Sequence, residues 1–85
     1  MNKSLLSRKQ KRLQSWTRFL SSIEAPDVRQ RMERTLREFH NVLVRAWESE
    51  DATDRYDAEI LDLERQLESL DEEARLRVVG RNRAA

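Results

Sequence analysis

The side chains most often used in catalysis are scarce in this 85-residue chain, which has one histidine and no cysteine. The histidine, His40, lies at the edge of an apolar stripe between Leu36 and Val44, a setting more typical of a structural residue than of a general base. The single glycine rules out a glycine-rich phosphate loop, and no serine–histidine–aspartate order or paired metal-ligand spacing is present. We therefore predict a protein that is not an enzyme and that holds no cofactor and no metal.

A different chemistry, binding to phosphate, is indicated by a cluster of cations near the N-terminus. This basic patch consists of Arg8, Lys9, Lys11, Arg12 and Arg18. Cations of this kind can neutralise nucleic-acid phosphates, and the aromatic residues Trp16 and Phe19 lie close by in the sequence. However, Trp16 falls on an apolar stripe, and no glycine turn of the helix-turn-helix kind is present. Nucleic-acid binding is therefore our second hypothesis rather than our first.

The element that must position these groups is the stretch from Pro26 to Trp47. Its apolar residues recur in steps of three and four, which is the spacing of one helix face. They are Val28, Met32, Leu36, Phe39, Leu43, Ala46 and Trp47. The stripe spans roughly 140° of the helix, so it can contact two neighbouring helices at once. Pro26 suits the first turn and Asp27 the positive start of a helix, and the spacing predicts a helix over residues 26–48.

Two further helices are predicted on either side of this central one. The first covers residues 4–23, with Ser4 as its N-cap, and ends at the break before Pro26. The last covers residues 53–78 and has the most regular heptad in the chain. Its apolar residues are Tyr56, Ile60, Leu63, Leu67, Leu70 and Ala74. Gly80 is a natural stop, so residues 80–85 are predicted to be a disordered basic tail.

These elements predict an all-α fold, an antiparallel helical hairpin or three-helix bundle, in one domain of residues 1–79. The segment 48–54 decides between two arrangements, because it interrupts the apolar stripe but contains neither glycine nor proline. A turn in this segment gives the bundle. A helix that continues through it gives the alternative, a short helix plus one long continuous helix from Pro26 to about Val78.

The charges are divided unevenly along the chain: residues 1–47 carry a net charge of +7, residues 48–73 a net charge of −10 and the remainder +4. Acidic residues occupy five of the six positions that flank the last heptad. They are Asp57, Glu59, Glu64, Asp71 and Glu73. Like charges disfavour pairing of this helix with its own copy, so it needs a basic partner. Three partners fit: another helix of the same chain, the basic half of a second copy, or a basic groove on a different protein.

We predict a protein-interaction module that acts as an adaptor, chaperone or inhibitor, a set of functions found among small helical bacterial and phage regulators. The residues assigned to the partner surface are Trp47, Arg45, Val44, Leu61 and Glu64. A core this small supplies little stability alone, so we also expect a homodimer. No apolar run approaches the ~20 residues of a membrane span, and we expect a cytoplasmic protein.

Overall fold

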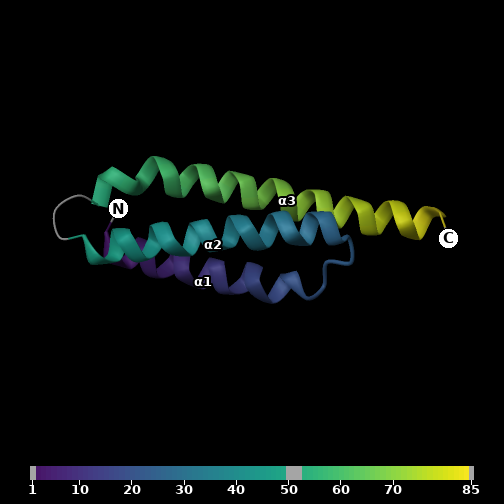
Figure 1. Ribbon diagram of the computed structural model, residues 1–85, viewed down its shortest axis with the longest axis horizontal. Helices are drawn as coiled ribbons and strands as arrows, with labels where there is room; N and C mark the ends of the chain where they lie inside the picture. Colours follow the sequence, from purple (N-terminus) through teal and green to yellow (C-terminus); the bar gives the residue numbers. More distant parts are fainter. Residues whose placement is uncertain (1, 50–52, 85) are drawn as a thin grey trace.

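The computed structural model describes residues 2–49 and 53–84 and, within them, the side chains of residues 2–49 and 55–77. Three helices make up the fold: α1 (Lys3–Leu20), α2 (Pro26–Glu48) and α3 (Asp57–Ala84), with a short 3-10 helix, η1 (Thr53–Tyr56), directly before α3. Successive helices run in opposite directions in an elongated bundle, and the described residues contain no strand (Figure 1). The predicted all-α three-helix bundle is confirmed.

The central helix, α2, packs closely against both of its neighbours. Its buried residues fall on one stripe, as its periodicity predicts. They are Val28, Met32, Thr35, Leu36, Phe39, Val42, Leu43 and Ala46. By contrast, no Cα atom of α1 lies within 8 Å of a Cα atom of α3 in the part of the chain that the structure describes. The wide stripe of α2 therefore serves two helices, and α2 holds the bundle together.

The core joins the three helices through large apolar side chains. Phe39 of α2 is fully buried, and its ring meets Trp16 of α1 edge-to-face, with centroids 6.2 Å apart and planes inclined at 65°. Ile60 and Leu67 of α3 are fully buried on the other side of the stripe. Edge-to-face contact is a favoured arrangement of two aromatic rings, so Trp16 belongs to the core rather than to a binding surface.

The first helix differs from its prediction at both ends. Its N-cap is Asn2 instead of Ser4, because the Asn2 side chain accepts a hydrogen bond of 2.8 Å from the Leu5 backbone N–H. It ends at Leu20, before the predicted residue 23, because the Ile23 N–H bonds back to the Leu20 carbonyl in a tighter turn. Ile23 nevertheless remains buried, although it lies outside the helix.

The segment after α2 decides between the two predicted arrangements. Ser49 has φ −75° and ψ 124°, so the chain leaves the helical conformation there. The alternative of one long helix from Pro26 is therefore wrong, and α3 instead returns along α2. Of the predicted turn, residues 50–52 lie outside the described residues.

The C-terminal end of α3 also differs from its prediction. The helix continues across Gly80 to Ala84, whereas the sequence predicted a stop near residue 78 and a disordered tail from 80 to 85. Ala85, the last residue of that predicted tail, lies outside the described residues. No described glycine has a positive φ, so Gly80 does not adopt the left-handed conformation by which glycine ends many helices. As a result, this part of α3 projects beyond α1 and α2 (Figure 1).

Candidate interaction surfaces

A charged seam joins α1 to α3. Glu64 Oε1 of α3 forms an ion pair with Lys9 Nζ at 2.6 Å, and Glu64 Oε2 accepts a hydrogen bond from Arg12 Nη1 at 2.9 Å. Arg12 Nη2 donates to Glu68 Oε1 at 2.6 Å. The Arg12 guanidinium also lies 4.6 Å from the centre of the Trp16 ring. Within the described residues, the Cα atoms of α1 and α3 are all more than 8 Å apart, so the contact between these two helices is made by long side chains. The structure therefore shows the first of the three predicted partners of the acidic helix, which is another helix of the same chain.

Two groups of predicted site residues must be corrected as a result. The Glu64 side chain is only 5% exposed, so it does not lie on a partner surface as the sequence predicted. Lys9 and Arg12 face α3 and are separated from the rest of the predicted basic patch. The helical periodicity of one helix says which residues share a face, but the carboxylate that each cation meets depends on how two helices are aligned.

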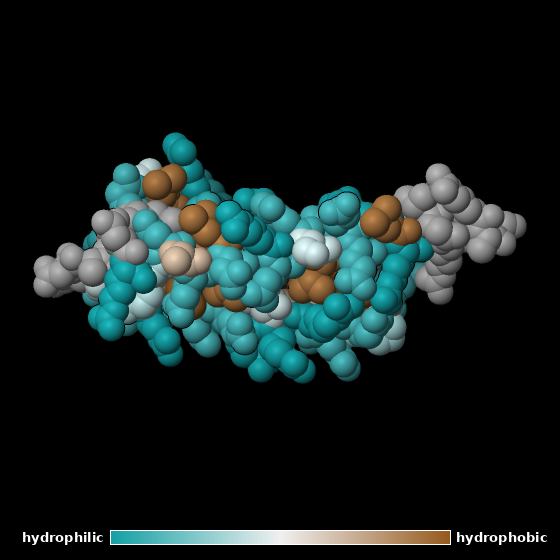
Figure 2. Space-filling model, turned by 90° about the horizontal axis from the view of Figure 1, so that it is seen from above, coloured by the Kyte–Doolittle hydropathy of each residue, from teal (hydrophilic) through white to brown (hydrophobic). Residues whose placement is uncertain are grey.

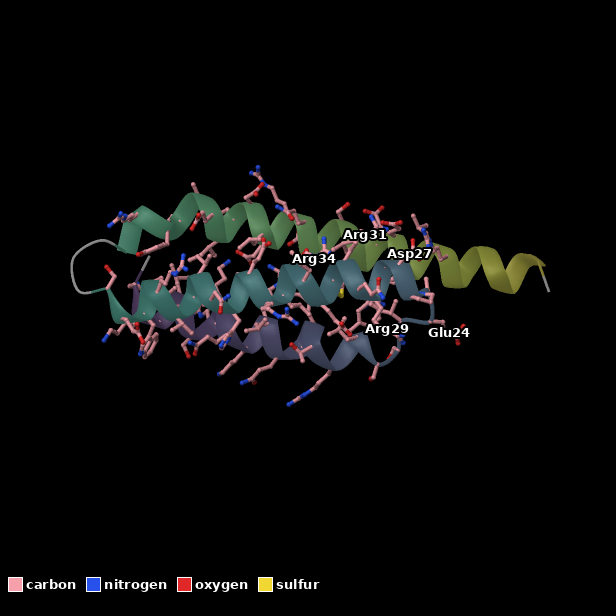
Figure 3. The ribbon with its side chains drawn as sticks, in the orientation of Figure 1. Glu24, Asp27, Arg29, Arg31 and Arg34 are labelled. Atoms are coloured by element: carbon pink, nitrogen blue, oxygen red, sulfur yellow. The ribbon has the colours of Figure 1, made fainter. Side chains whose placement is uncertain are left out.

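A second charged contact ties the start of α2 to α3. Arg31 donates to Glu73 at 2.8 Å, and Arg77 donates to Asp27 at 2.8 Å and to Glu73 at 3.1 Å. Figure 3 shows Asp27, Arg31 and Arg34 on the side of α2 that faces α3. The hydrogen bond from Arg77 lowers the pKa of Asp27 below its ordinary value, and the same bond raises the pKa of Arg77. All four side chains are 36–58% exposed, so water screens this contact more than the ion pairs at the buried Glu64.

The rest of the predicted basic patch does not take part in the seam with α3: it comprises Arg8, Lys11 and Arg18. All three side chains are exposed, and within the described residues none forms an ion pair. The whole of α1 contains no acidic residue. The fold therefore divides the patch into two inward cations that bind α3 and three outward cations that remain free.

The predicted partner residues other than Glu64 gather at one end of the bundle. Large apolar side chains are exposed here on each helix: Leu5 of α1 by 39%, Trp47 of α2 by 41% and Leu61 of α3 by 48%. The helices alternate in direction, so the start of α1, the end of α2 and the start of α3 meet at this end. Figure 2 shows apolar side chains, in brown, toward the left end of the view, where α2 ends and α3 begins. We call Leu5, Trp47 and Leu61 the apolar end.

Trp47 is the residue of the apolar end whose position was hardest to predict. Ala46 occupies the middle of the α2 stripe and is buried, which turns Trp47 by about 100° toward the edge of the stripe. Lys3 Nζ lies 5.3 Å from the centre of the Trp47 ring, on the α1 side. Arg45 beside it is exposed and Val44 is half-buried. Leu5, which is also exposed at this end, was not among the predicted partner residues.

Other kinds of site find no support in the described part of the chain. No group of three or more histidine, aspartate or glutamate side chains there could hold a metal ion. No helix among these residues is long and apolar enough to cross a membrane. Comparison of the chain with protein-family models, with curated proteins and with solved structures found no match. The surfaces described above are therefore the basis for assigning a function.

Proposed function

We propose that this chain is a non-enzymatic interaction module that binds a larger protein partner through its apolar end, as an adaptor, chaperone or inhibitor. The observation that carries this proposal is that each of the three helices presents an exposed large apolar side chain at the same end. Exposed large apolar side chains that gather on a small protein often mark an interaction site.

The composition of this end supports a protein partner. Tryptophan is among the residue types most enriched at binding hot spots, and Trp47 is exposed at this end. The end also exists only when all three helices are assembled, because each helix contributes one residue. Binding would therefore depend on the folded bundle and not on one isolated helix.

The test compares substitutions at the two ends of the molecule. The tagged full chain captures the partner from an extract, and the Kd for the purified partner is then measured by calorimetry. Replacing Trp47 with Ala should weaken binding by about 2 kcal/mol, or about thirtyfold in Kd. The matched control is Leu76→Asp, because Leu76 is 62% exposed but lies near the opposite end. Equal weakening by both variants would disprove the role of the apolar end.

A second copy of the chain is the other occupant to be distinguished. The small core motivates self-association, and light scattering at micromolar concentration measures it directly. If Leu61→Asp converts a dimer into a monomer, the apolar end serves a homodimer. If the wild-type chain is already a monomer, the apolar end is free to bind a different protein.

A further inference from the structure

The outward face of α1 carries positive charge that nothing in the bundle uses. Arg8, Lys11 and Arg18 are exposed and free of ion pairs in the described residues. Exposed serines complete the row: Ser4 lies one turn before Arg8, and Ser15 lies between Lys11 and Arg18. These side chains follow one another in helical steps along the same face. Since α1 contains no carboxylate at all, this face attracts anions along its whole length.

A groove beside these cations adds neutral hydrogen-bonding groups. It lies between α1 and α2, has a volume of about 540 Å³, and no carboxylate lines it. Its lining residues are Gln10, Leu13, Gln14, Thr17, Arg18 and His40. Arginine, glutamine and threonine side chains are among those that contact phosphate and sugar oxygens of nucleic acids. Arg18 belongs to both the groove and the outward face, so the two form one continuous surface.

The same face lacks the side chains that other partners require. None of the exposed large apolar residues lies between residues 8 and 18, so a protein partner finds no apolar anchor there. Single-stranded nucleic acid is bound by stacking its bases on aromatic rings. Both aromatic rings of α1 are occupied, since Trp16 is buried against Phe39 and Arg75 covers Phe19 at 4.7 Å. The observations therefore favour a double-stranded nucleic acid, whose bases remain stacked inside the duplex and whose phosphates face outward.

We propose that the outward face of α1 binds the phosphate backbone of duplex DNA without reading its sequence. Arg8 and Arg18 are ten residues apart, which is about 15 Å along the helix. Over that length a duplex presents about nine phosphate charges. Because α1 contains no carboxylate, no acidic side chain of this helix competes with the phosphates for the three cations. This surface is separate from the apolar end, so the proposal does not depend on binding to a protein partner.

The salt dependence of binding gives the first test. Full-length chain is titrated into a labelled duplex of about 20 base pairs, and binding is followed by fluorescence anisotropy. Three phosphate contacts predict a slope of about −2.7 in log K against log salt, or about a fortyfold loss from about 50 mM to about 200 mM salt. Absence of binding by the wild-type chain at the lower salt concentration overturns the proposal.

A pair of variants with the same net charge then locates the surface. In the first, Lys11 and Arg18 are both replaced by Glu, which should weaken duplex binding by about tenfold or more at low salt. The control replaces Arg55 of η1 and Arg65 of α3 with Glu, because both are exposed cations that have no ion pair in the described residues. It should bind within about threefold of the wild type. Equal losses in the two variants refute a site on α1.

Competition separates duplex DNA from the other polyanions. Unlabelled duplex should displace the labelled duplex at a concentration about tenfold lower than single-stranded DNA of the same length or polyglutamate of the same charge. If the single strand competes as well as the duplex, the affinity does not depend on the double-stranded form, and the duplex assignment is wrong. If polyglutamate competes equally, the face selects acidic protein segments and the proposal also fails.

Discussion

The contacts that α2 makes with its neighbours differ in kind from the contact between α1 and α3. On α2, a stripe of fully buried side chains such as Met32, Phe39 and Leu43 packs against both flanking helices. Between α1 and α3, Lys9 and Arg12 reach across to Glu64, and within the described residues no Cα atom of α1 lies within 8 Å of one of α3. One type of contact buries apolar surface, and the other joins opposite charges.

The difference separates two tasks of the fold. Apolar burial favours association of the helices but is indifferent to direction, because it depends mainly on the area removed from water. The charged seam depends on alignment, since Lys9 and Arg12 meet Glu64 and Glu68 only when the parallel helices α1 and α3 are in this register. We infer that the apolar stripe supplies most of the stability and that the seam selects the arrangement.

The largest expected effect comes from the apolar side. Replacing the fully buried Phe39 with Ala removes its contact with Trp16 and leaves a cavity, at a cost of about 3–5 kcal/mol. That loss is comparable with the whole stability of a domain this small. Chemical denaturation followed by circular dichroism measures it. A loss below about 1 kcal/mol would show that the stripe is not the main source of stability.

The next effect comes from the buried end of the charged seam. Glu64→Gln keeps the shape of the side chain but removes the charge that Lys9 and Arg12 share, and should cost about 1–2 kcal/mol. The cost is limited because Arg12 is partly exposed and can turn to water. The free energy of unfolding should also become less sensitive to salt in this variant. An unchanged free energy of unfolding would contradict a stabilising role for the seam.

A smaller effect is expected at the exposed end of the same seam. Glu68 is about half exposed, so its ion pair with Arg12 is screened by water, and Glu68→Gln should cost no more than about 0.5 kcal/mol. Comparison with Glu64→Gln isolates the influence of burial, because both carboxylates meet the same arginine. If Glu68→Gln proves the more costly of the two, burial does not control the strength of the seam.

The smallest effect concerns pH and the contact between Asp27 and Arg77. Because Arg77 lowers the pKa of Asp27 in the folded state, the contact contributes fully above the ordinary pKa of 3.8 and is lost as the pH falls through the lowered value. The Tm of the wild type should therefore fall more steeply below about pH 4 than that of Asp27→Asn. Parallel Tm profiles would show that this exposed pair contributes nothing measurable.

The features that follow from periodicity could be predicted from the sequence. The helix from Pro26 to Glu48 was predicted at its observed ends, because its proline start and its apolar stripe are both local signals. The need of the acidic helix for a basic partner also followed from its own charges. Which base would meet which acid did not follow, because that depends on how the third helix is placed against the first.

The errors at the helix ends have local causes. Asn2 and Ser4 can both cap a helix, and the sequence does not say which of the two side chains turns toward the first free N–H groups. Gly80 permits a helix to end but does not require it. For the site, Trp47 was placed on the apolar stripe as well as among the partner residues, and in the structure it is exposed. Glu64 was also assigned to a partner surface, whereas its side chain is buried beneath Lys9 and Arg12.

The two tryptophans differ in exposure, so their fluorescence should respond differently to changes in the protein. Trp16 is sealed in the core, so its emission should lie at short wavelength and resist quenching by iodide until the bundle unfolds. Trp47 stands at the surface under Lys3, where iodide can reach it and a bound partner would shield it. Tryptophan fluorescence and its quenching by iodide should therefore report separately on unfolding of the core, through Trp16, and on exposure of the surface at Trp47.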